Sequence, residues 1–307
     1  MIELSRLEIF LQAAESLSFS EAAKLLHLTQ PTVSHHIQAL EQDLGLTLFE
    51  RSGSGLHLTE AGQLLLPWAR KLIRESTELQ DMMTSLQNRI VGSLRIACST
   101  TSGKYLLPLL AARFHERHPG IKFTILSCTQ ANVIPRLLGE EASLGVLSRE
   151  VGGEGIEYQE FFEDHIILIA SARHPWATEA AIEPADLLHT PFITREPSSG
   201  TRRVMLAELA MHDISMDDLD IFLEVGNAEA IVEAVAAGYG VSFVSRLAAA
   251  SALKLGKVVE VPILNVNLHR KIYMVRREIE TRSRAQEVFW SFIHDPANAD
   301  LLNLAEA

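Results

Sequence analysis

The sequence predicts an α/β protein in which an N-terminal winged helix-turn-helix and a long linker helix precede two α/β lobes. A helix, a turn, a second helix and a two-stranded wing follow one another through residues 20–62. Beyond residue 91, short apolar runs alternate with helical stretches, a pattern typical of parallel sheets covered by helices. We therefore expect a DNA-binding domain over residues 1–58, a linker helix over 59–90 and an α/β domain over 91–307.

The helix-turn-helix is predicted from capping residues and apolar spacing. Ser20 is expected to cap the first helix, and Thr29 the second, with Pro31 tolerated in its first turn. In the second helix Val33 and Ile37 begin an apolar stripe that faces the core. The polar side chains then point outward toward the major groove: Gln30, Thr32, Ser34, His35 and Gln38.

Gly45 is expected to end the second helix, and the segment that follows reads as a wing. Leu46, Leu48 and Phe49 predict a short buried strand, and residues 51–55 predict a flexible tip. Arg51, at the base of the wing, suits a contact with a DNA phosphate.

The first 62 residues carry three basic and eight acidic side chains, a net charge of −5 with histidine neutral. A domain with a net negative charge cannot bind DNA through overall electrostatic attraction. We therefore expect weak binding that depends on dimerisation, helix N-termini and a few well-positioned hydrogen-bond donors. Phosphates beside His35 and His36 would favour their charged forms, so we expect DNA affinity to rise as pH falls. The alternative is that one of the two histidines packs against the first helix.

The segment SFSEAAKLLHLTQPTVSHHIQALEQDLGLTLFER resembles the signature of LysR-type transcriptional regulators, and the similarity runs from about Leu4 to Phe292. Relatives often place Arg or Lys on the recognition helix where this chain has His35, His36 and Gln38. The resemblance implies a periplasmic-binding-protein-like effector domain whose chain crosses between lobes near Phe161 and returns near Leu268. The first lobe would then hold residues 91–161 and 269–307, and the second 162–268.

The linker helix is expected to mediate dimerisation. A lone amphipathic helix of this length is marginal without a partner, and its leucines recur every seven residues. In LysR-type regulators the corresponding helix pairs between subunits, which implies a homodimer and a further homotetramer. The expected contacts are Leu65, Trp68, Leu72, Leu79, Met82 and Leu86.

Composition fits a cytoplasmic protein without a membrane partner. No apolar run has membrane-spanning length, and the first ten residues mix Glu and Arg where a signal peptide would be apolar. The net charge of −12 says little beyond solubility. Cys98 and Cys128 each lie at the end of a predicted strand, where cysteines are more often buried, inert thiols. The alternative is a redox switch between the two thiols, if their strands are neighbours. His115 and His118 lack the further ligands that a metal site requires, so neither a metal nor a cofactor is expected.

Two strand-to-helix loops predict an anion site. Residues 99–103 and 195–203 each offer hydroxyls and free N–H groups at a helix N-terminus, and the second loop adds guanidinium groups. Both loops are similar to those in the LysR branch that controls sulfur assimilation and carbon fixation, whose effectors are small oxyanions or phosphorylated metabolites. The candidate effector contacts are Ser99, Thr100, Ser102, Ser148, Ser199, Thr201 and Arg202.

The sequence leaves the roles of two further features undecided. Ser143 stands where the family usually has Asp, which puts in doubt a hydrogen bond from that carboxylate to neighbouring backbone. Ser245 and Arg246 either face the cleft or cap the next helix.

The sequence thus predicts a DNA-binding transcriptional regulator controlled by a small anionic metabolite, such as a sulfur oxyanion, bound between two lobes. Its expected partners are double-stranded DNA, the effector and a second copy of itself, with RNA polymerase a further candidate. The alternative is a solute-binding sensor whose DNA binding is weak or lost. No nucleophile is paired with a base, so we expect no enzymatic activity.

Overall fold

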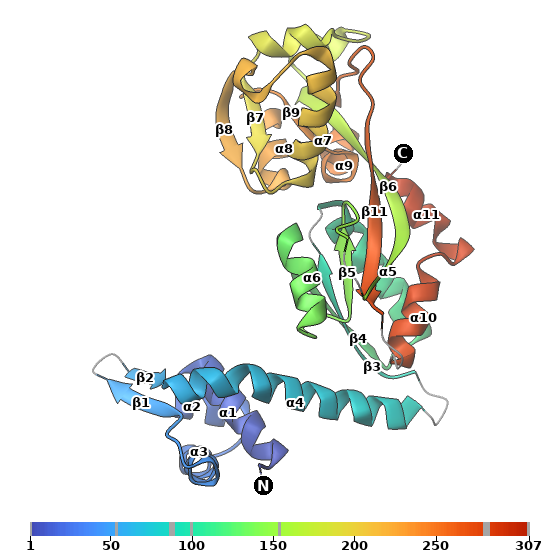
Figure 1. The fold of residues 1–307 in the computed structure, drawn as a ribbon. Coiled ribbons are helices and arrows are strands. Elements are labelled where there is room, and N and C mark those ends of the chain that lie inside the picture. The colour runs from blue at the N-terminus through green and yellow to red at the C-terminus, as the bar shows by residue number, and fades with distance from the viewer. Residues whose placement is uncertain are drawn as a thin grey trace. The chain divides into compact units, whose positions relative to one another are not determined.

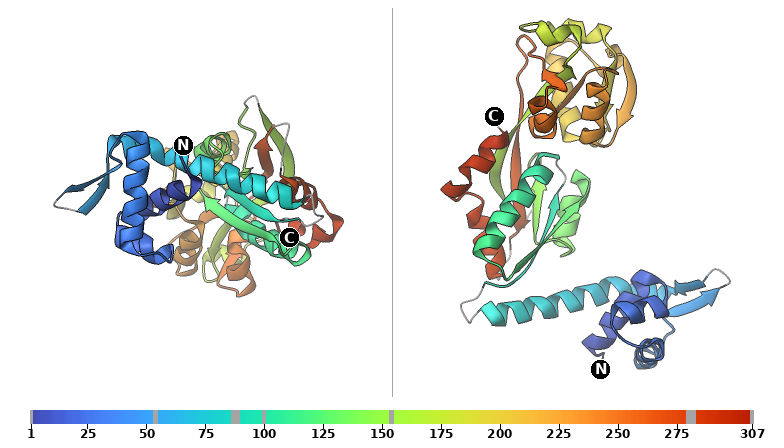
Figure 2. Two further views of the ribbon diagram at one scale, coloured as in Figure 1. Left: turned by 90° about the horizontal axis from the view of Figure 1, so that it is seen from below. Right: turned by 180° about the vertical axis from the view of Figure 1, so that it is seen from behind.

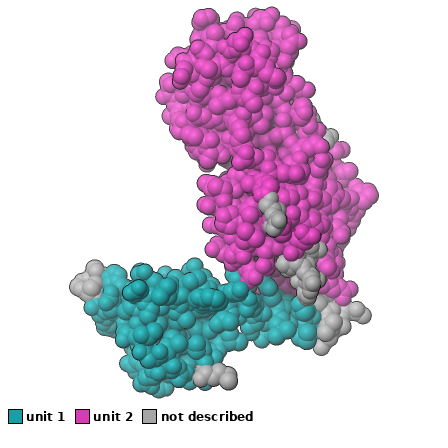
Figure 3. All heavy atoms as spheres, viewed as in Figure 1, with its two compact units in different colours: residues 1–89 teal, residues 90–307 magenta. Residues whose placement is uncertain are grey.

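The computed structural model describes residues 2–52, 55–85, 90–98, 101–152, 155–278 and 283–305. The chain divides into two compact units, residues 1–89 and 90–307, which Figure 3 colours separately. Within the described ranges, no helix is both long and apolar enough to span a bilayer.

Unit 1 is a winged helix-turn-helix extended by one long helix (Figure 1). Its core is formed by Phe10, Ala22 and Val33 from three helices, together with Leu48 and Phe49 at the entrance to the wing. The elements are α1 (Leu4–Ser16), α2 (Phe19–Leu25), α3 (Gln30–Leu44), β1 (Phe49–Ser52), β2 (Gly55–Leu58) and α4 (Glu60–Ser85).

Capping fixes the two helices of the motif, with one correction to the sequence prediction. The Thr29 hydroxyl accepts a hydrogen bond from the Thr32 N–H at 3.3 Å, and Gly45 ends α3 in the left-handed region at φ 68°, as expected. Ser20, however, does not cap α2. Ser18 does, accepting from the Glu21 N–H, because Phe19 is already helical and packs edge-on against Phe49.

The wing consists of β1 and β2, paired antiparallel from Phe49 opposite Leu58 to Ser52 opposite Gly55. The expected strand from Leu46 is therefore displaced toward Arg51, and Leu46 is 57 % exposed. The Thr59 hydroxyl caps α4 by accepting from the Gly62 N–H. A methyl group at position 62 would overlap the Leu48 carbonyl oxygen, so glycine lets α4 pack closely on the wing.

Unit 2 holds two lobes joined by two long antiparallel strands. Figures 1 and 2 show β6 and β11 running side by side from one lobe into the other. Their register places Leu268 opposite Ile166, close to the crossing points predicted from the family resemblance. The strands of unit 2 are β3 (Gly92–Cys98), β4 (Ile121–Ser127), β5 (Leu144–Leu147), β6 (Ile156–Ser171), β7 (Phe192–Arg195), β8 (Ile221–Val225), β9 (Ser242–Ser245), β10 (Val258–Glu260) and β11 (Leu268–Arg277).

The sheets are mixed, not purely parallel. In the described part of the chain, one seven-stranded sheet has the order β10-β6-β11-β5-β3-β4, with β9 also paired to β6. The pairs β3–β4, β3–β5 and β7–β8 are parallel, whereas every pair made by β6 or β11 is antiparallel. The parallel pattern predicted from sequence therefore holds inside each lobe and ends at the crossing strands.

Helices cover both lobes. They are α5 (Thr101–Arg117), α6 (Gln130–Leu138), α7 (Gly200–Leu209), α8 (Ala228–Ala236), α9 (Arg246–Lys254), α10 (Arg284–Phe292) and α11 (Ala299–Leu302). Short 3₁₀ turns are η1 (Pro175–Thr178), η2 (Pro184–His189), η3 (Ala210–His212), η4 (Met216–Asp218), η5 (Pro296–Asn298) and η6 (Asn303–Ala305).

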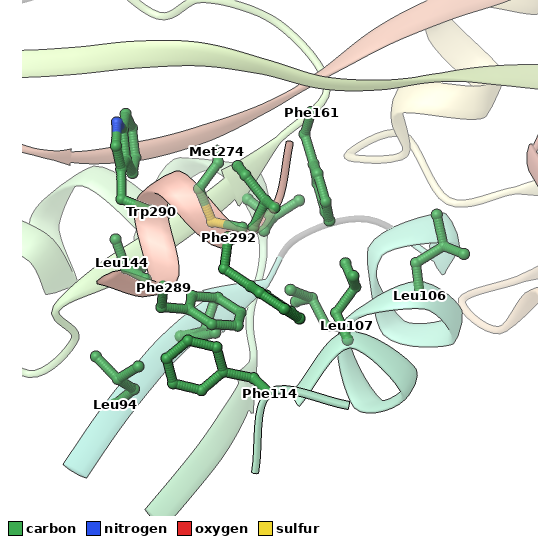
Figure 4. Close-up of a cluster of buried hydrophobic side chains, with 14 of the residues drawn as sticks. Leu94, Leu106, Leu107, Phe114, Leu144, Phe161, Met274, Phe289, Trp290 and Phe292 are labelled. Carbon is green, nitrogen blue, oxygen red and sulfur yellow. The ribbon is translucent and has the colours of Figure 1, made fainter. Parts of the chain in front are cut away.

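The first lobe has an aromatic core. Phe114 on α5 meets Phe289 and Phe292 on α10 at ring-centroid distances of 5.1 and 5.0 Å, and all three side chains are buried (Figure 4). Burying one such side chain contributes about 1.5–3 kcal/mol. This core packs α5 and α10 against β3, β4 and β5.

Candidate functional site

The outward face of α3 is polar, as predicted. His35 and Gln38 are exposed, while Gln30, Thr32 and Ser34 are half-buried and Val33, Ile37 and Leu40 point into the core. The Thr32 hydroxyl lies 2.8 Å from the Thr29 hydroxyl, so it is engaged in the cap of α3. His36 is half-buried and its ring lies 6.1 Å from that of His35, so the two histidines differ in exposure.

Most cations of unit 1 are engaged by its own carboxylates. Arg6 pairs with Glu3 and Asp43, Lys24 with Glu21, and Arg70 with Glu15. Arg51 is exposed on β1, and no ion pair is found for it among the described residues of this unit. Among the cations that the structure describes in unit 1, Arg51 is left without a carboxylate partner, and its contact with a phosphate stays a prediction.

Arg51 and Gln30 line the same polar hollow of about 400 Å³. The hollow is lined by residues from three elements. They are Ser18 and Ser20 before and within α2, Gln30 at the start of α3, and Arg51 and Gly55 on the wing. Residues far apart in the sequence are therefore brought to one surface. That surface offers hydroxyl, amide and guanidinium donors, which are the groups that contact DNA phosphates.

The long helix α4 carries an exposed apolar stripe. Trp68, Leu72 and Leu79 are 63 %, 41 % and 57 % exposed, and Leu64 and Met83 extend the stripe. Leu65, in contrast, is half-buried and packs against the core of unit 1, so its role in a dimer contact stays a prediction. Met82 is half-buried and Leu86 lies outside the described residues.

A cavity of about 300 Å³ lies between the two lobes. Its walls are the carboxyl ends of β4, β5 and β7 and the N-terminal residues of α6 and α7, the usual location of ligand sites in α/β folds. Of the predicted effector residues, Ser148, Ser199 and Thr201 line it. Ser99 and Thr100 lie outside the described residues, and so does the side chain of Ser102.

The second-lobe wall is the start of α7. Ser199 and Thr201 are 5 % and 3 % exposed, and the Ser199 hydroxyl accepts from the Arg202 N–H. The Arg202 guanidinium does not line the cavity, which corrects its prediction as an effector contact. It donates to the Arg195 carbonyl at 2.9 Å and to Glu224 Oε2 at 2.6 Å, because α7 turns that side chain toward β8.

The first-lobe wall includes Gln130, which the sequence reasoning missed. Gln130 Oε1 accepts from the Ser148 hydroxyl at 3.0 Å and from Arg203 Nη2 at 3.3 Å. Its Nε2 is buried and has no hydrogen-bond partner in the described structure. A buried unpaired donor is costly, so a ligand acceptor at this point would be favoured. The signal available in the sequence was its place shortly after the apolar run of residues 123–126, which is typical of a strand.

Arg270 on β11 forms the floor of the cavity. Its Nε and Nη2 donate to Asp164 Oδ2 on β6 at 2.9 and 2.7 Å, and Asp164 Oδ1 accepts from the Ser245 hydroxyl at 2.6 Å. All three side chains are buried. Ser245 therefore faces this network and makes no capping bond to α9, while Arg246 pairs with Glu260.

Positive charge gathers around this floor. Burial lowers the pKa of Arg203, and the charges of Arg149 and Arg270 lower it further. Lys104 also lines the cavity, whereas Arg195 is neutralised by two hydrogen bonds to Glu196. Mutual repulsion among cations of this kind is relieved when an anion binds between them.

Cys128 lines the cavity, but the structure argues against a disulfide with Cys98. Their strands are neighbours, with Cys98 opposite Ser127, so Cys128 points to the other face of the sheet. Cys98 belongs to the aromatic core, whereas Cys128 packs beside Ala97 on the opposite side. Burial raises the pKa of Cys128, which disfavours its reactive thiolate.

Three further sequence features now have structural explanations. The Ser143 hydroxyl accepts from the Arg95 N–H at 3.1 Å, so it makes the backbone contact expected of the carboxylate that it replaces. His115 Nδ1 lies 3.0 Å from the Ile121 carbonyl oxygen, and the His118 ring packs at a tilt against Phe114, with 4.6 Å between the ring centroids.

Comparison with known proteins matches both units. The family model described as "Bacterial regulatory helix-turn-helix protein, lysR family" matches residues 4–63, and "LysR substrate binding domain" matches residues 87–297. The transcriptional activator CmpR of Synechocystis sp. is 31 % identical over 296 residues, covering 96 % of each chain.

Solved structures agree with the fold. Full-length CbnR complexed with its target DNA aligns with a TM-score of 0.74 at 24 % identity, over 95 % of this chain and 99 % of that one. The regulatory domain of Synechocystis CcmR in complex with 2-PG aligns with a TM-score of 0.60 at 27 % identity. It covers 66 % of this chain and 95 % of the CcmR chain.

Proposed function

Because the chain belongs to the LysR family of DNA-binding transcriptional regulators, we propose that α3 and the wing bind operator DNA and that a small anion in the interlobe cavity controls this binding. The family establishes a regulator with an effector-binding domain, and its relatives are regulators rather than enzymes. The finer assignment of residues and effector is our proposal.

The observation that carries the anion proposal is the donor set of the cavity. Polar side chains from both lobes and from the floor line the same cavity. They are Ser148 and Gln130 from one lobe, Ser199 and Thr201 from the other, and Arg270 from the floor. The unpaired Gln130 Nε2 and the crowded cations favour an acceptor-rich, negatively charged ligand. The CcmR domain, which was solved with 2-PG, supports a small-molecule ligand for this fold. A sulfur oxyanion is one member of the class that we propose.

For DNA, we propose contacts from Gln30, Ser34, His35, Gln38 and Arg51, with Thr32 positioning the start of α3. The complex of CbnR with its target DNA supports this use of the fold. We further propose a homodimer formed through the exposed stripe of α4, which pairs two DNA-binding domains and offsets the weak charge of each. Association of two such dimers would give the expected tetramer.

The acidic character of unit 1 favours a second candidate, a sensor that has lost specific DNA binding. One experiment separates the two. The full chain is titrated onto its own upstream intergenic DNA at two salt concentrations, with and without sulfate, sulfite, thiosulfate, phosphate, 2-PG or small carboxylates.

A specific footprint that shifts with one anion supports the regulator and identifies its ligand class. Specific binding that no anion changes contradicts the anion proposal. Absence of specific binding at low salt and mildly acidic pH supports the sensor instead.

A further inference from the structure

The two lobes approach each other closely at Gly200, the first residue of α7. A methyl group at position 200 would lie 2.6 Å from the Ser148 hydroxyl oxygen and 2.7 Å from Arg270 Nη1. Ordinary contacts of a Cβ begin at about 3.4 Å. Ser148 follows β5 in the first lobe and Arg270 lies on the crossing strand β11, so no side chain fits between them and the second lobe.

The backbone of Gly200 does not itself require glycine. Gly200 is absent from the glycines with positive φ, and it begins a helix, where alanine has the better propensity. The close approach of the lobes is therefore the physical reason for a glycine at this position.

The groups that a methyl would meet are held in place. The Ser148 hydroxyl donates to Gln130 Oε1, and two other nitrogens of Arg270 donate to buried Asp164. Moving either group would break these bonds. Only the remaining nitrogen, Nη1, is directed toward the cavity and Gly200.

Hydrogen bonds between described residues also cross from one lobe to the other. Arg203 on α7 donates to Gln130 on α6, and the Tyr105 hydroxyl on α5 donates to Glu229 Oε1 on α8 at 2.8 Å. The lobes are thus in contact on more than one side, with Gly200 at the cavity itself.

We propose that Gly200 sets how far the lobes close on the anion, and that this closure brings Arg270 Nη1 against it. Gly200 is a positioning residue, and the inference rests on the proposed anion site. Gly200→Ala should hold the lobes apart and weaken anion binding by about tenfold to a hundredfold. The fold and the DNA binding measured without anion should be retained.

The test uses the full chain and its Gly200→Ala variant. Calorimetric titration with sulfate, thiosulfate, phosphate and 2-PG gives the affinity, and hydrogen exchange reports the opening of the β5 end and the first turn of α7. Gly152→Ala is the matched control, because a methyl there meets nothing within 4 Å and φ is not positive.

We expect Gly200→Ala to bind the anion more weakly and to exchange faster at both segments, with Gly152→Ala like the unaltered protein. Equal anion affinity in the three proteins, or unchanged exchange in Gly200→Ala, overturns the closure role while leaving the anion site intact. If the unaltered protein binds none of the anions, the proposed function fails first, and the closure inference fails with it.

Should Gly200→Ala not fold, Ser148→Ala provides a second route. Without the hydroxyl, the nearest atom of residue 148 would be its Cβ, 3.4 Å from the new methyl. The double variant Ser148→Ala with Gly200→Ala should therefore fold, and its anion affinity is compared with that of Ser148→Ala alone. We expect the double variant to bind more weakly, because its methyl still lies 2.7 Å from Arg270 Nη1, and equal affinity in these two proteins would overturn the closure role.

Discussion

Arg270 and Asp164 face each other across β11 and β6, with Nη2 of the arginine 2.7 Å from Oδ2 of the carboxylate. Their side chains are only 6 % and 0 % exposed. The pair lies where the chain crosses between lobes, and Ser245 from β9 completes it. One buried network therefore links both crossing strands, the second lobe and the floor of the cavity.

Removing one partner of this pair should destabilise unit 2 strongly. Asp164→Asn leaves the Arg270 guanidinium buried without a counter-charge, at an expected cost of about 3–5 kcal/mol. Urea unfolding followed by circular dichroism measures the change. The double variant Asp164→Leu with Arg270→Met should recover most of the loss, since it removes both charges. A loss below about 1 kcal/mol for Asp164→Asn would show that water or another group compensates.

Arg51→Gln should weaken DNA binding across sequences and lower the slope of log affinity against log salt by about one, as expected for one lost phosphate contact. Fluorescence anisotropy with an operator fragment at several salt concentrations gives both values. Lys24→Gln is the control, because Lys24 is already paired with Glu21. An unchanged slope for Arg51→Gln would remove Arg51 from the DNA interface.

Leu72→Glu or Leu79→Glu should dissociate the proposed dimer, since each places a charge in the exposed apolar stripe of α4. Sedimentation velocity at micromolar concentration should show a shift from dimer to monomer. Gln80→Glu adds the same charge at an exposed polar position and should leave the dimer intact. Dimers that persist in both leucine variants would place the interface elsewhere.

Stability should fall as the pH drops below the ordinary histidine range, in part because of His174. Burial lowers the pKa of His174 from 6.5, and its Nδ1 accepts from the Trp176 N–H. The unfolded chain therefore binds the proton more tightly than the folded one. The stabilisation is complete above pH 6.5 and decreases as pH falls toward the lowered folded pKa.

His174→Asn keeps an acceptor for the Trp176 N–H and removes this titration. We expect the free energy of unfolding of the unaltered protein, relative to His174→Asn, to decrease between pH 7 and pH 5. A difference that stays constant over this range would show that His174 titrates alike in both states.

Local features of the fold were predictable because their causes are local. Thr29 and Gly45 bound α3 through capping and a left-handed turn, and the apolar spacing of Val33 and Ile37 identified its buried face. The prediction failed where one competing contact decided the outcome. Ser18 rather than Ser20 caps α2, because the helix already begins at Phe19.

The family and the order of the helices and wing in unit 1 follow from the amino-acid sequence, because their signals lie in neighbouring residues. Which side chains reach the cavity depends on the tertiary structure. Arg270 meets Asp164 across 106 residues, Gln130 meets Ser148 through the packing of α6 beside β5, and Arg202 is turned away to Glu224. Those side-chain contacts depend on strand order and register, which cannot be inferred from the hydrophobic periodicity of a single segment.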